Sequence, residues 1–182
     1  MNRLSRTRKL TFGAICVALC YVLPLILHSF GGGKIFSPMH FPVLLCGVIC
    51  GPVYGCLCGI LGPILSSILS GTPSAAMLIS MIPELVMYGL VSGVIIKYEQ
   101  KMTLYARVYA ALIPAMIAGR VMGGMVKAVV YMSSAESYSI AAWASAYFVK
   151  TLPGAILQLV LIPVIVLSLS KAGFISVKEK TR

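Results

Sequence analysis

Residues 38–70 read PMHFPVLLCGVICGPVYGCLCGILGPILSSILS and contain no Asp, Glu, Lys or Arg. A glycine–proline pair interrupts this apolar stretch twice, at Gly51 and Pro52 and again at Gly62 and Pro63. Such pairs end or kink a helix, because proline cannot donate a backbone hydrogen bond and glycine adopts turn conformations easily. The stretch therefore predicts two short apolar helices with a turn near the first pair.

The rest of the chain is also strongly apolar. Of its 182 residues, 59% are hydrophobic and only 10% are charged, unlike an average soluble domain. Such a chain needs lipid as its solvent. A spanning helix takes roughly 20 apolar residues, so this length holds about six. We predict an all-α integral membrane protein, a six-transmembrane-helix bundle that forms a single transmembrane substrate-binding domain over residues 1–182.

Helix-breaking and polar segments set the expected boundaries. Outer loops are expected where glycine or polar residues gather, at 29–38, 71–74 and 133–139, and a basic inner loop is expected at 97–104. The expected helices cover residues 9–28, two segments within 39–70, then 75–96, 105–132 and 140–170.

The distribution of positive charge indicates membrane topology. A net charge of +11 would suggest nucleic acid as the partner of a soluble protein, but here the basic residues gather at three places, which the positive-inside rule puts in the cytoplasm. Both termini are therefore expected to be cytoplasmic, with an even number of spans and no nucleic-acid partner. The three places are Arg3, Arg6, Arg8 and Lys9; Lys97, Lys101 and Arg107; and Lys171, Lys178, Lys180 and Arg182.

A signal peptide is the alternative interpretation of the basic start. Residues 10–27 are long for the apolar core of such a peptide, and no small-residue cleavage site clearly follows them. We therefore expect this segment to be the first membrane helix.

The six cysteines lie within apolar runs, where they act as small hydrophobic side chains. We expect free thiols, with neither a disulfide framework nor a metal site. These residues are Cys16, Cys20, Cys46, Cys50, Cys56 and Cys58.

Small residues recur at four-residue spacing, which lets helix backbones approach closely. Two interpretations are open: tight packing inside one bundle, or docking onto another membrane protein. The sets are Ala14 and Ala18; Gly47, Gly51, Gly55 and Gly59; Gly89 and Gly93; and Ala115, Gly119 and Gly123.

Four ionisable side chains fall inside predicted helices: Glu84, Arg120, Lys127 and Lys150. A charge at the bilayer centre costs about 2.5–3.5 kcal/mol, so these side chains must face the bundle interior or water. Three cations stand against one carboxylate, and an anionic ligand would complete the set. We predict that these residues line an outward-facing substrate pocket.

Five polar or aromatic residues on the same predicted helices complete the candidate site. Tyrosines lie within one helical turn of three of the charged residues, and a histidine opens the second helix on the outer side. The five residues are His40, Tyr88, Tyr131, Tyr147 and Gln158.

Purely structural roles are the alternative for these residues. Lys127 and Lys150 would then snorkel to the outer headgroups, and Glu84 would pair with Arg120. His40 would be an interfacial histidine, and the tyrosines would belong to the core.

Enzyme signatures are absent from the sequence. It has no Asp, and it lacks the HExxH, Gly-x-Ser-x-Gly and P-loop patterns. Without a nucleotide site, the chain cannot power uphill transport by itself, so a partner that supplies energy is implied. A self-contained small-solute carrier or channel and an intramembrane enzyme remain the alternatives. No cofactor is expected.

Two segments carry a family resemblance: SPMHFPVLLCG at residues 37–47 and GPVYG at 51–55. Together with the chain length, the basic N-terminus and the pair Ala14 and Ala18, they make the sequence similar to the substrate-binding S components of energy-coupling-factor (ECF) transporters. These are small six-helix proteins that capture vitamins or metal ions outside bacterial cells.

The resemblance implies a set of partners and a mechanism. Ala14 and Ala18 would dock on a transmembrane coupling protein, the T component, which binds two cytoplasmic ATPases. The chain would bind its substrate outside the bacterial cell membrane, under loops 29–38 and 133–139, and then topple so that the site opens inward. ATP hydrolysis would take place in the partners, so the chain itself would not be an enzyme.

The segment around His40 is most similar to the pantothenate-type or a related vitamin subgroup. The pantothenate carboxylate would suit the excess of cations in the predicted pocket. Nicotinate, pyridoxine-like compounds, hydroxymethylpyrimidine, folate, queuosine-type bases and cobalamin remain open. A nickel or cobalt carrier is not expected, because the chain begins Met1-Asn2-Arg3 without a His-rich segment.

Overall fold

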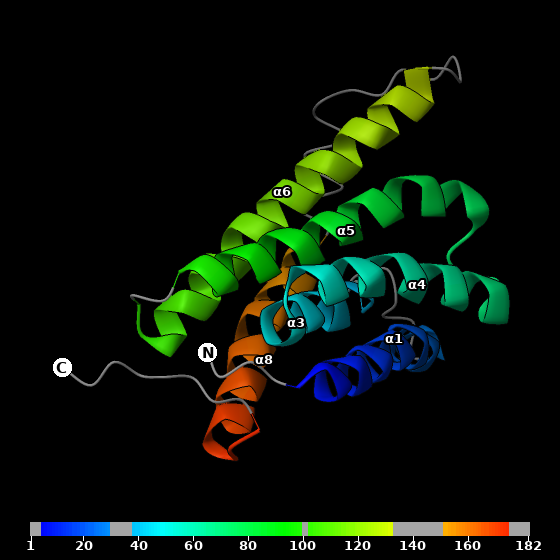
Figure 1. The fold of residues 1–182 in the computed structure, drawn as a ribbon. Helices are drawn as coiled ribbons and strands as arrows, with labels where there is room; N and C mark the ends of the chain where they lie inside the picture. The colour runs from blue at the N-terminus through cyan, green and yellow to red at the C-terminus, as the bar shows by residue number, and fades with distance from the viewer. Residues whose placement is uncertain (1–4, 30–37, 100–101, 133–150, 175–182) are drawn as a thin grey trace.

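The computed structural model describes residues 5–29, 38–99, 102–132 and 151–174. Every element in this part of the chain is a helix, which confirms the all-α prediction (Figure 1). The elements are α1 (Arg6–Ser29), α3 (His40–Cys50), α4 (Pro52–Ser70), α5 (Ala75–Tyr98), α6 (Leu104–Met132) and α8 (Leu152–Lys171).

Glycine and proline place the boundaries of the two helices predicted from residues 38–70. Gly51 separates α3 from α4 with a φ of 96°, and Pro52 opens α4. Gly71 then ends α4 with a φ of 67°. Both glycines adopt positive φ, which a residue with a Cβ rarely does. The predicted pair of helices with a turn after Gly51 is therefore confirmed.

Five of the described helices are long and apolar enough to cross a membrane, namely α1, α4, α5, α6 and α8. The sixth, α3, has 11 residues, and at 1.5 Å per residue it extends only about 16 Å, roughly half of the hydrocarbon core. The described part of the chain thus contains six helices, and the prediction that six helices span the membrane is not confirmed. Residues 140–150 of the last predicted helix lie outside the described part of the chain.

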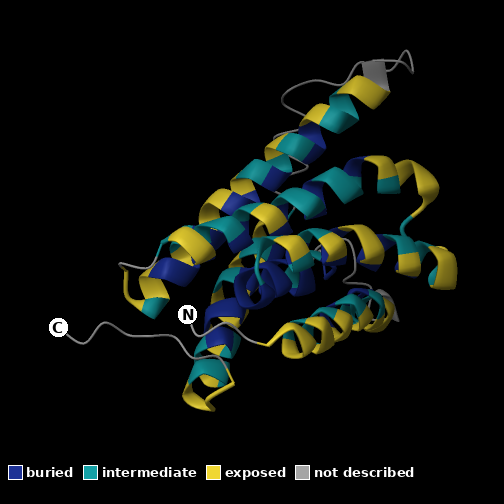
Figure 2. Ribbon diagram, in the orientation of Figure 1, coloured by how far each residue is buried: buried dark blue, intermediate teal, exposed yellow. Residues whose placement is uncertain are grey.

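The short helix α3 occupies the centre of the bundle. It contacts each of the other five described helices, and residues 42–50 are all buried. Figure 2 shows α3 almost entirely in the buried colour, whereas α1 is largely exposed. Many large apolar side chains on the long helices are also exposed. In a membrane protein, such exposed apolar surface is the face that contacts lipid.

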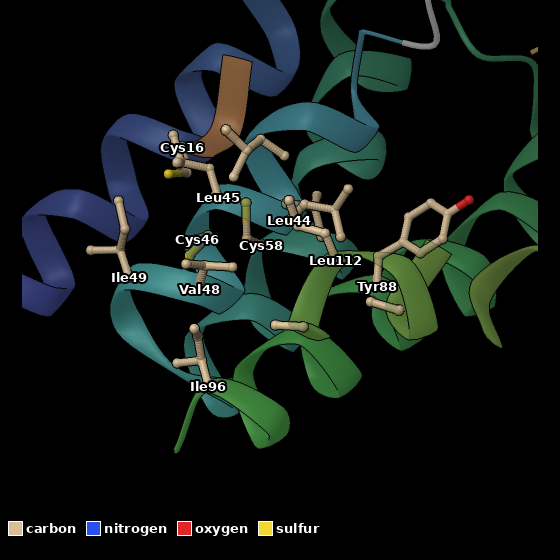
Figure 3. Packing of buried hydrophobic residues seen from close by; sticks show 14 of the residues in the cluster. Cys16, Leu44, Leu45, Cys46, Val48, Ile49, Cys58, Tyr88, Ile96 and Leu112 are labelled. Atoms are coloured by element: carbon tan, nitrogen blue, oxygen red, sulfur yellow. The ribbon is translucent and has the colours of Figure 1, made fainter. Parts of the chain in front are cut away.

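The core of the bundle is apolar and rich in cysteine. Leu44, Leu45 and Cys46 of α3 pack against side chains from the other helices, with Tyr88 at one end of the cluster (Figure 3). All six cysteines are free thiols. The Sγ atoms of Cys20 and Cys58 lie 3.9 Å apart in this core. The cysteines fill space between helices as small hydrophobic side chains.

Three helices meet at a junction of glycines. A Cβ built at Gly55 of α4 would lie 2.6 Å from the carbonyl oxygen of Gly89 in α5 and 2.9 Å from the Cα of Gly47 in α3. Real Cβ atoms do not come so close to backbone atoms. The small side chains therefore let these three backbones touch, which is the type of contact that associates helices in lipid.

The glycine stripes pack inside the bundle, whereas the alanine pair does not. Gly59 faces the backbone of Leu85, and Gly93 faces Pro52. Ala14 and Ala18 of α1, by contrast, are both exposed. Of the two interpretations of small-residue spacing, internal packing thus applies to the glycines.

A buried arginine at the start of α6 forms hydrogen bonds to the end of α5. Arg107 is only 4% exposed, and its Nε and Nη2 atoms donate hydrogen bonds to the carbonyl oxygen of Ile96. This carbonyl belongs to the last turn of α5, where intrahelical partners run out. Arg107, predicted only as a topology signal, therefore also caps a helix.

The junction predicts that Gly55→Ala will destabilise the bundle. The added methyl meets backbone atoms of two other helices, which cannot move aside as a side chain can. We expect a loss of about 3 kcal/mol, or a melting temperature lower by roughly 5–10 °C in detergent. The matched control is Gly13→Ala, where the new Cβ would lie 3.7 Å from Tyr54 in ordinary contact. Equal melting temperatures for the two variants would contradict close backbone contact at Gly55.

Candidate functional site

Three side chains form a polar cluster where α3 and α5 meet. Oε1 of Glu84 accepts a hydrogen bond of 3.0 Å from the hydroxyl of Tyr88, one turn later on α5. The same oxygen lies 3.2 Å from Nε2 of His40, the first residue of α3. Glu84 is 7% exposed and Tyr88 is 2% exposed, so the carboxylate is held by partners rather than by water. We call these residues the His40–Glu84–Tyr88 cluster.

The histidine ring is fixed on two sides. Its centroid lies 5.1 Å from that of the Tyr88 ring, at an interplanar angle of 58°. Because a carboxylate only accepts hydrogen bonds, its approach to Nε2 implies that this nitrogen carries a proton. In a neutral ring, Nδ1 is then a hydrogen-bond acceptor. An ionised Glu84 thus favours the Nε2–H tautomer of a neutral His40 ring.

The second nitrogen of His40 is the notable polar atom of the cluster. Nδ1 is buried, and it has no hydrogen-bond partner among the described residues. A buried polar atom left without a partner costs about 1–3 kcal/mol, so each such atom calls for an explanation, such as a water, an ion or a ligand. Nδ1 is the atom of the cluster at which such a partner could bind.

Helix α6 closes the other side of the cluster with glycines. A Cβ at Gly123 would lie 2.8 Å from Oε2 of Glu84, and a Cβ at Gly119 would collide with the ring of Tyr88. The sequence pattern had indicated these glycines only as helix-packing residues. Their absent side chains leave the space that the carboxylate and the phenol occupy, so they shape the site as well.

Helix α6 carries two cations, and one of them, Arg120, lies near the cluster. Arg120 follows Gly119 and is half-buried, and it acts electrostatically on the Tyr88 phenol. Lys127 lies two turns further along α6 and is also half-buried. Both cations make additional interactions in the structure. Among the described residues, the cluster therefore combines the carboxylate of Glu84 with one neighbouring cation, Arg120.

The remaining predicted residues are placed only in part. Gln158 is buried on α8, which packs against α3 and α6, but it makes no hydrogen bond to the cluster within the described part of the chain. Tyr131 lies in α6, and its side chain is not described. Tyr147 and Lys150 lie outside the described residues. The structure thus brings together His40, Glu84, Tyr88 and Arg120.

The two prominent cavities lie away from this cluster. One, of about 540 Å³, runs between α1 and α4 and is lined by Ala14, Ala18 and large apolar side chains such as Leu57 and Leu61. The other, of about 500 Å³, lies where α4 begins and α5 ends. Within the described residues, no group of three or more His, Cys, Asp or Glu side chains could hold a metal ion.

Comparison with known proteins identifies the family. The family model described as "ECF transporter, substrate-specific component" matches residues 8–166. The chain belongs to this family. No curated protein and no solved structure shows significant similarity to it.

Membership in the ECF substrate-specific components establishes the general role of the chain. Such components are substrate-binding transport subunits rather than enzymes, which agrees with the lack of catalytic motifs. The five apolar helices and the family together indicate a multi-pass membrane protein. The resemblance predicted from residues 37–47 and 51–55 is therefore confirmed at the level of the family.

The geometry predicts that Tyr88→Phe will destabilise the chain even without a ligand. The change removes the donor to Oε1 of Glu84 and leaves a buried carboxylate with one fewer hydrogen bond, at a cost of about 1–3 kcal/mol. The melting temperature in detergent should fall accordingly. Tyr109→Phe is the matched control, because Tyr109 is an exposed residue of α6. A Tyr88→Phe protein as stable as this control would show that the hydrogen bond contributes little.

Proposed function

We propose that this S component captures a carboxylate-bearing vitamin outside the bacterial cell and delivers it inward with a T component and two cytoplasmic ATPases. Pantothenate is the best candidate. The observation that carries the proposal is the buried His40–Glu84–Tyr88 cluster with its unpartnered Nδ1 atom.

The charges of the site support an anionic substrate. Glu84 contributes one negative charge, and Arg120 and Lys127 contribute two positive charges, so these described residues sum to +1. Lys150 would raise the sum further if it belongs to the pocket. Charges within a membrane favour a partner of opposite sign, because desolvation is costly. A substrate carboxylate would supply that partner.

The hydrogen-bonding atoms support a substrate that also carries polar groups. In the neutral tautomer described above, Nδ1 of His40 accepts a hydrogen bond. Pantothenate offers two hydroxyl groups and an amide N–H in addition to its carboxylate. One of these donors would satisfy Nδ1, while the carboxylate would approach Arg120.

The position of the cluster supports capture from the outer side. His40 begins α3, and Glu84 lies in the first half of α5, about 15 Å from the start of that helix at 1.5 Å per residue. The basic segments lie at the opposite helix ends, which are cytoplasmic by the positive-inside rule. Both termini are then cytoplasmic as well.

The exposed alanines support a docking role for α1. Ala14 and Ala18 lie on the surface beside the groove between α1 and α4. Small side chains there would allow a helix of the coupling protein to approach the α1 backbone closely. Energy from ATP hydrolysis in the partner subunits would then reach the S component through α1.

Ligand binding is the first test of this function. The chain purified alone in detergent should show a higher melting temperature with pantothenate than without, and a change in the fluorescence of Trp143, its only tryptophan. At a ligand concentration 100 times Kd, stabilisation should reach about 2.7 kcal/mol.

His40→Gln should weaken binding about tenfold, because the glutamine amide can replace Nε2 beside Glu84 but not Nδ1. Melting without ligand should change little in this variant.

Lys171→Gln on the exposed end of α8 serves as the control and should bind like the wild type. If another vitamin of the panel stabilises the chain, the transport role stands and the substrate assignment is wrong. A folded chain that binds none of them, yet chemically converts a substrate without partners, would favour an intramembrane enzyme. Uphill uptake by the chain alone in vesicles would favour a self-contained carrier.

Docking provides a separate prediction. Replacing both Ala14 and Ala18 with leucine should abolish co-purification with the T component and ATPases, because the larger side chains hold the helices apart. Vitamin binding should be unchanged, since both residues are exposed and remote from the cluster. Ala106→Leu, at an exposed alanine of α6, is the matched control and should assemble normally. Assembly of the double variant at wild-type yield would overturn the docking role.

A further inference from the structure

The cavity of about 500 Å³ is at the opposite end of the bundle from the His40–Glu84–Tyr88 cluster. Its walls come from the end of α3, the start of α4 and the end of α5, together with the first turn of α1. The lining residues are Lys9, Cys50, Gly51, Pro52, Val53, Tyr54, Gly93, Ile96, Lys97 and Tyr98. We call this cavity the Lys9–Lys97 pocket.

Two lysines supply the charge of the pocket, and no acidic residue is among its described lining residues. Lys97 also makes a further interaction in the structure. The Nζ atom of Lys9 lies 6.0 Å from the ring centroid of Tyr54, and that of Lys97 lies 5.4 Å from the ring centroid of Tyr98. Each cation therefore lies near the edge of cation–π range of a tyrosine. The lysines come from helices α1 and α5, which are distant in sequence.

The start of α4 adds backbone donors to the same pocket. Gly51 precedes the helix with a φ of 96°, and no side chain caps the helix N-terminus. The amide groups of Val53 and Tyr54, in the first turn, have no carbonyl partner within the helix. Together with the helix dipole, they reinforce the preference of the two lysines for an anion.

The remaining lining favours a lipid over a free ion. Cys50, Val53 and Ile96 are apolar, and Tyr54 and Tyr98 are of the type that lies at membrane–water interfaces. The pocket opens at the ends of membrane-spanning helices, where the phosphates of a bilayer are found. A phospholipid would place its phosphate near the lysines and the glycerol with the upper acyl chains against the apolar wall.

We propose that the Lys9–Lys97 pocket binds the phosphate headgroup of an anionic phospholipid. One bound lipid then bridges the start of α1 to α4 and α5, because its phosphate interacts with a lysine of α1 and a lysine of α5. This role is independent of the vitamin that the chain carries. It also gives the basic residues at this end a specific ligand in addition to their general effect on topology.

The test uses the full chain purified in a neutral detergent without added lipid. Short-chain phosphatidylglycerol should raise the melting temperature in a saturable way, whereas phosphatidylcholine of the same chain length should not. Inorganic phosphate at the same concentration should have no effect. The double variant Lys9→Gln/Lys97→Gln should weaken phosphatidylglycerol binding at least fivefold, and Lys171→Gln should bind like the wild type.

Several results would overturn the proposal. Equal stabilisation by phosphatidylcholine, or unchanged phosphatidylglycerol binding in the double variant, would show that the lysines do not recognise the headgroup. Stabilisation by inorganic phosphate alone would identify a free-ion site. If phosphatidylglycerol has no effect while the double variant loses the coupling protein on purification, the pocket takes an acidic segment of that partner instead. If the double variant fails to fold, two single variants replace it. Lys9→Gln removes the charge and should bind phosphatidylglycerol weakly, whereas Lys9→Arg keeps the charge and should retain binding.

Discussion

The backbone contact among Gly47, Gly55 and Gly89 is the constraint on which the rest of the bundle depends. Lipid supplies no hydrophobic force that would press helices together, so close packing has to come from shape. At this junction α3, α4 and α5 approach until their backbones touch. That approach holds α3 in the centre and brings its first residue, His40, beside Glu84 of α5.

The position of the His40–Glu84–Tyr88 cluster follows from that arrangement. Glu84 is a buried carboxylate, and it is stable in the bundle because Tyr88 and His40 both reach the same oxygen. Glycines on α6 leave the room that these side chains need. The proposed site therefore depends on a packing rule for membrane helices as much as on the charged residues themselves. In this arrangement Nδ1 of His40 has no hydrogen-bond partner among the described residues.

Much of the fold could be predicted from the sequence, because apolar length and glycine–proline breaks are local signals. The helix boundaries around Gly51 and Gly71 followed directly from such breaks. The family could also be inferred from the sequence, since residues 37–47 and 51–55 carry a specific pattern.

The pairing of His40 with Glu84 was not predicted, because the two residues are 44 positions apart and no periodicity connects different helices. Charge alone predicts Arg120 as a structural partner of Glu84, and Arg120 does lie near the cluster. The capping role of Arg107 was missed for a similar reason, since a basic residue near a loop gives the same sequence signal whether it is solvated or buried.

The central helix α3 is too short to reach both faces of a bilayer, and protein surrounds it along residues 42–50. Residues 42–50 therefore contact protein rather than acyl chains, whatever the thickness of the membrane. The five long helices must tilt or flex to match the acyl chains around them, but α3 has little contact with those chains. A change in membrane thickness therefore reaches α3 only through the helices that pack on it.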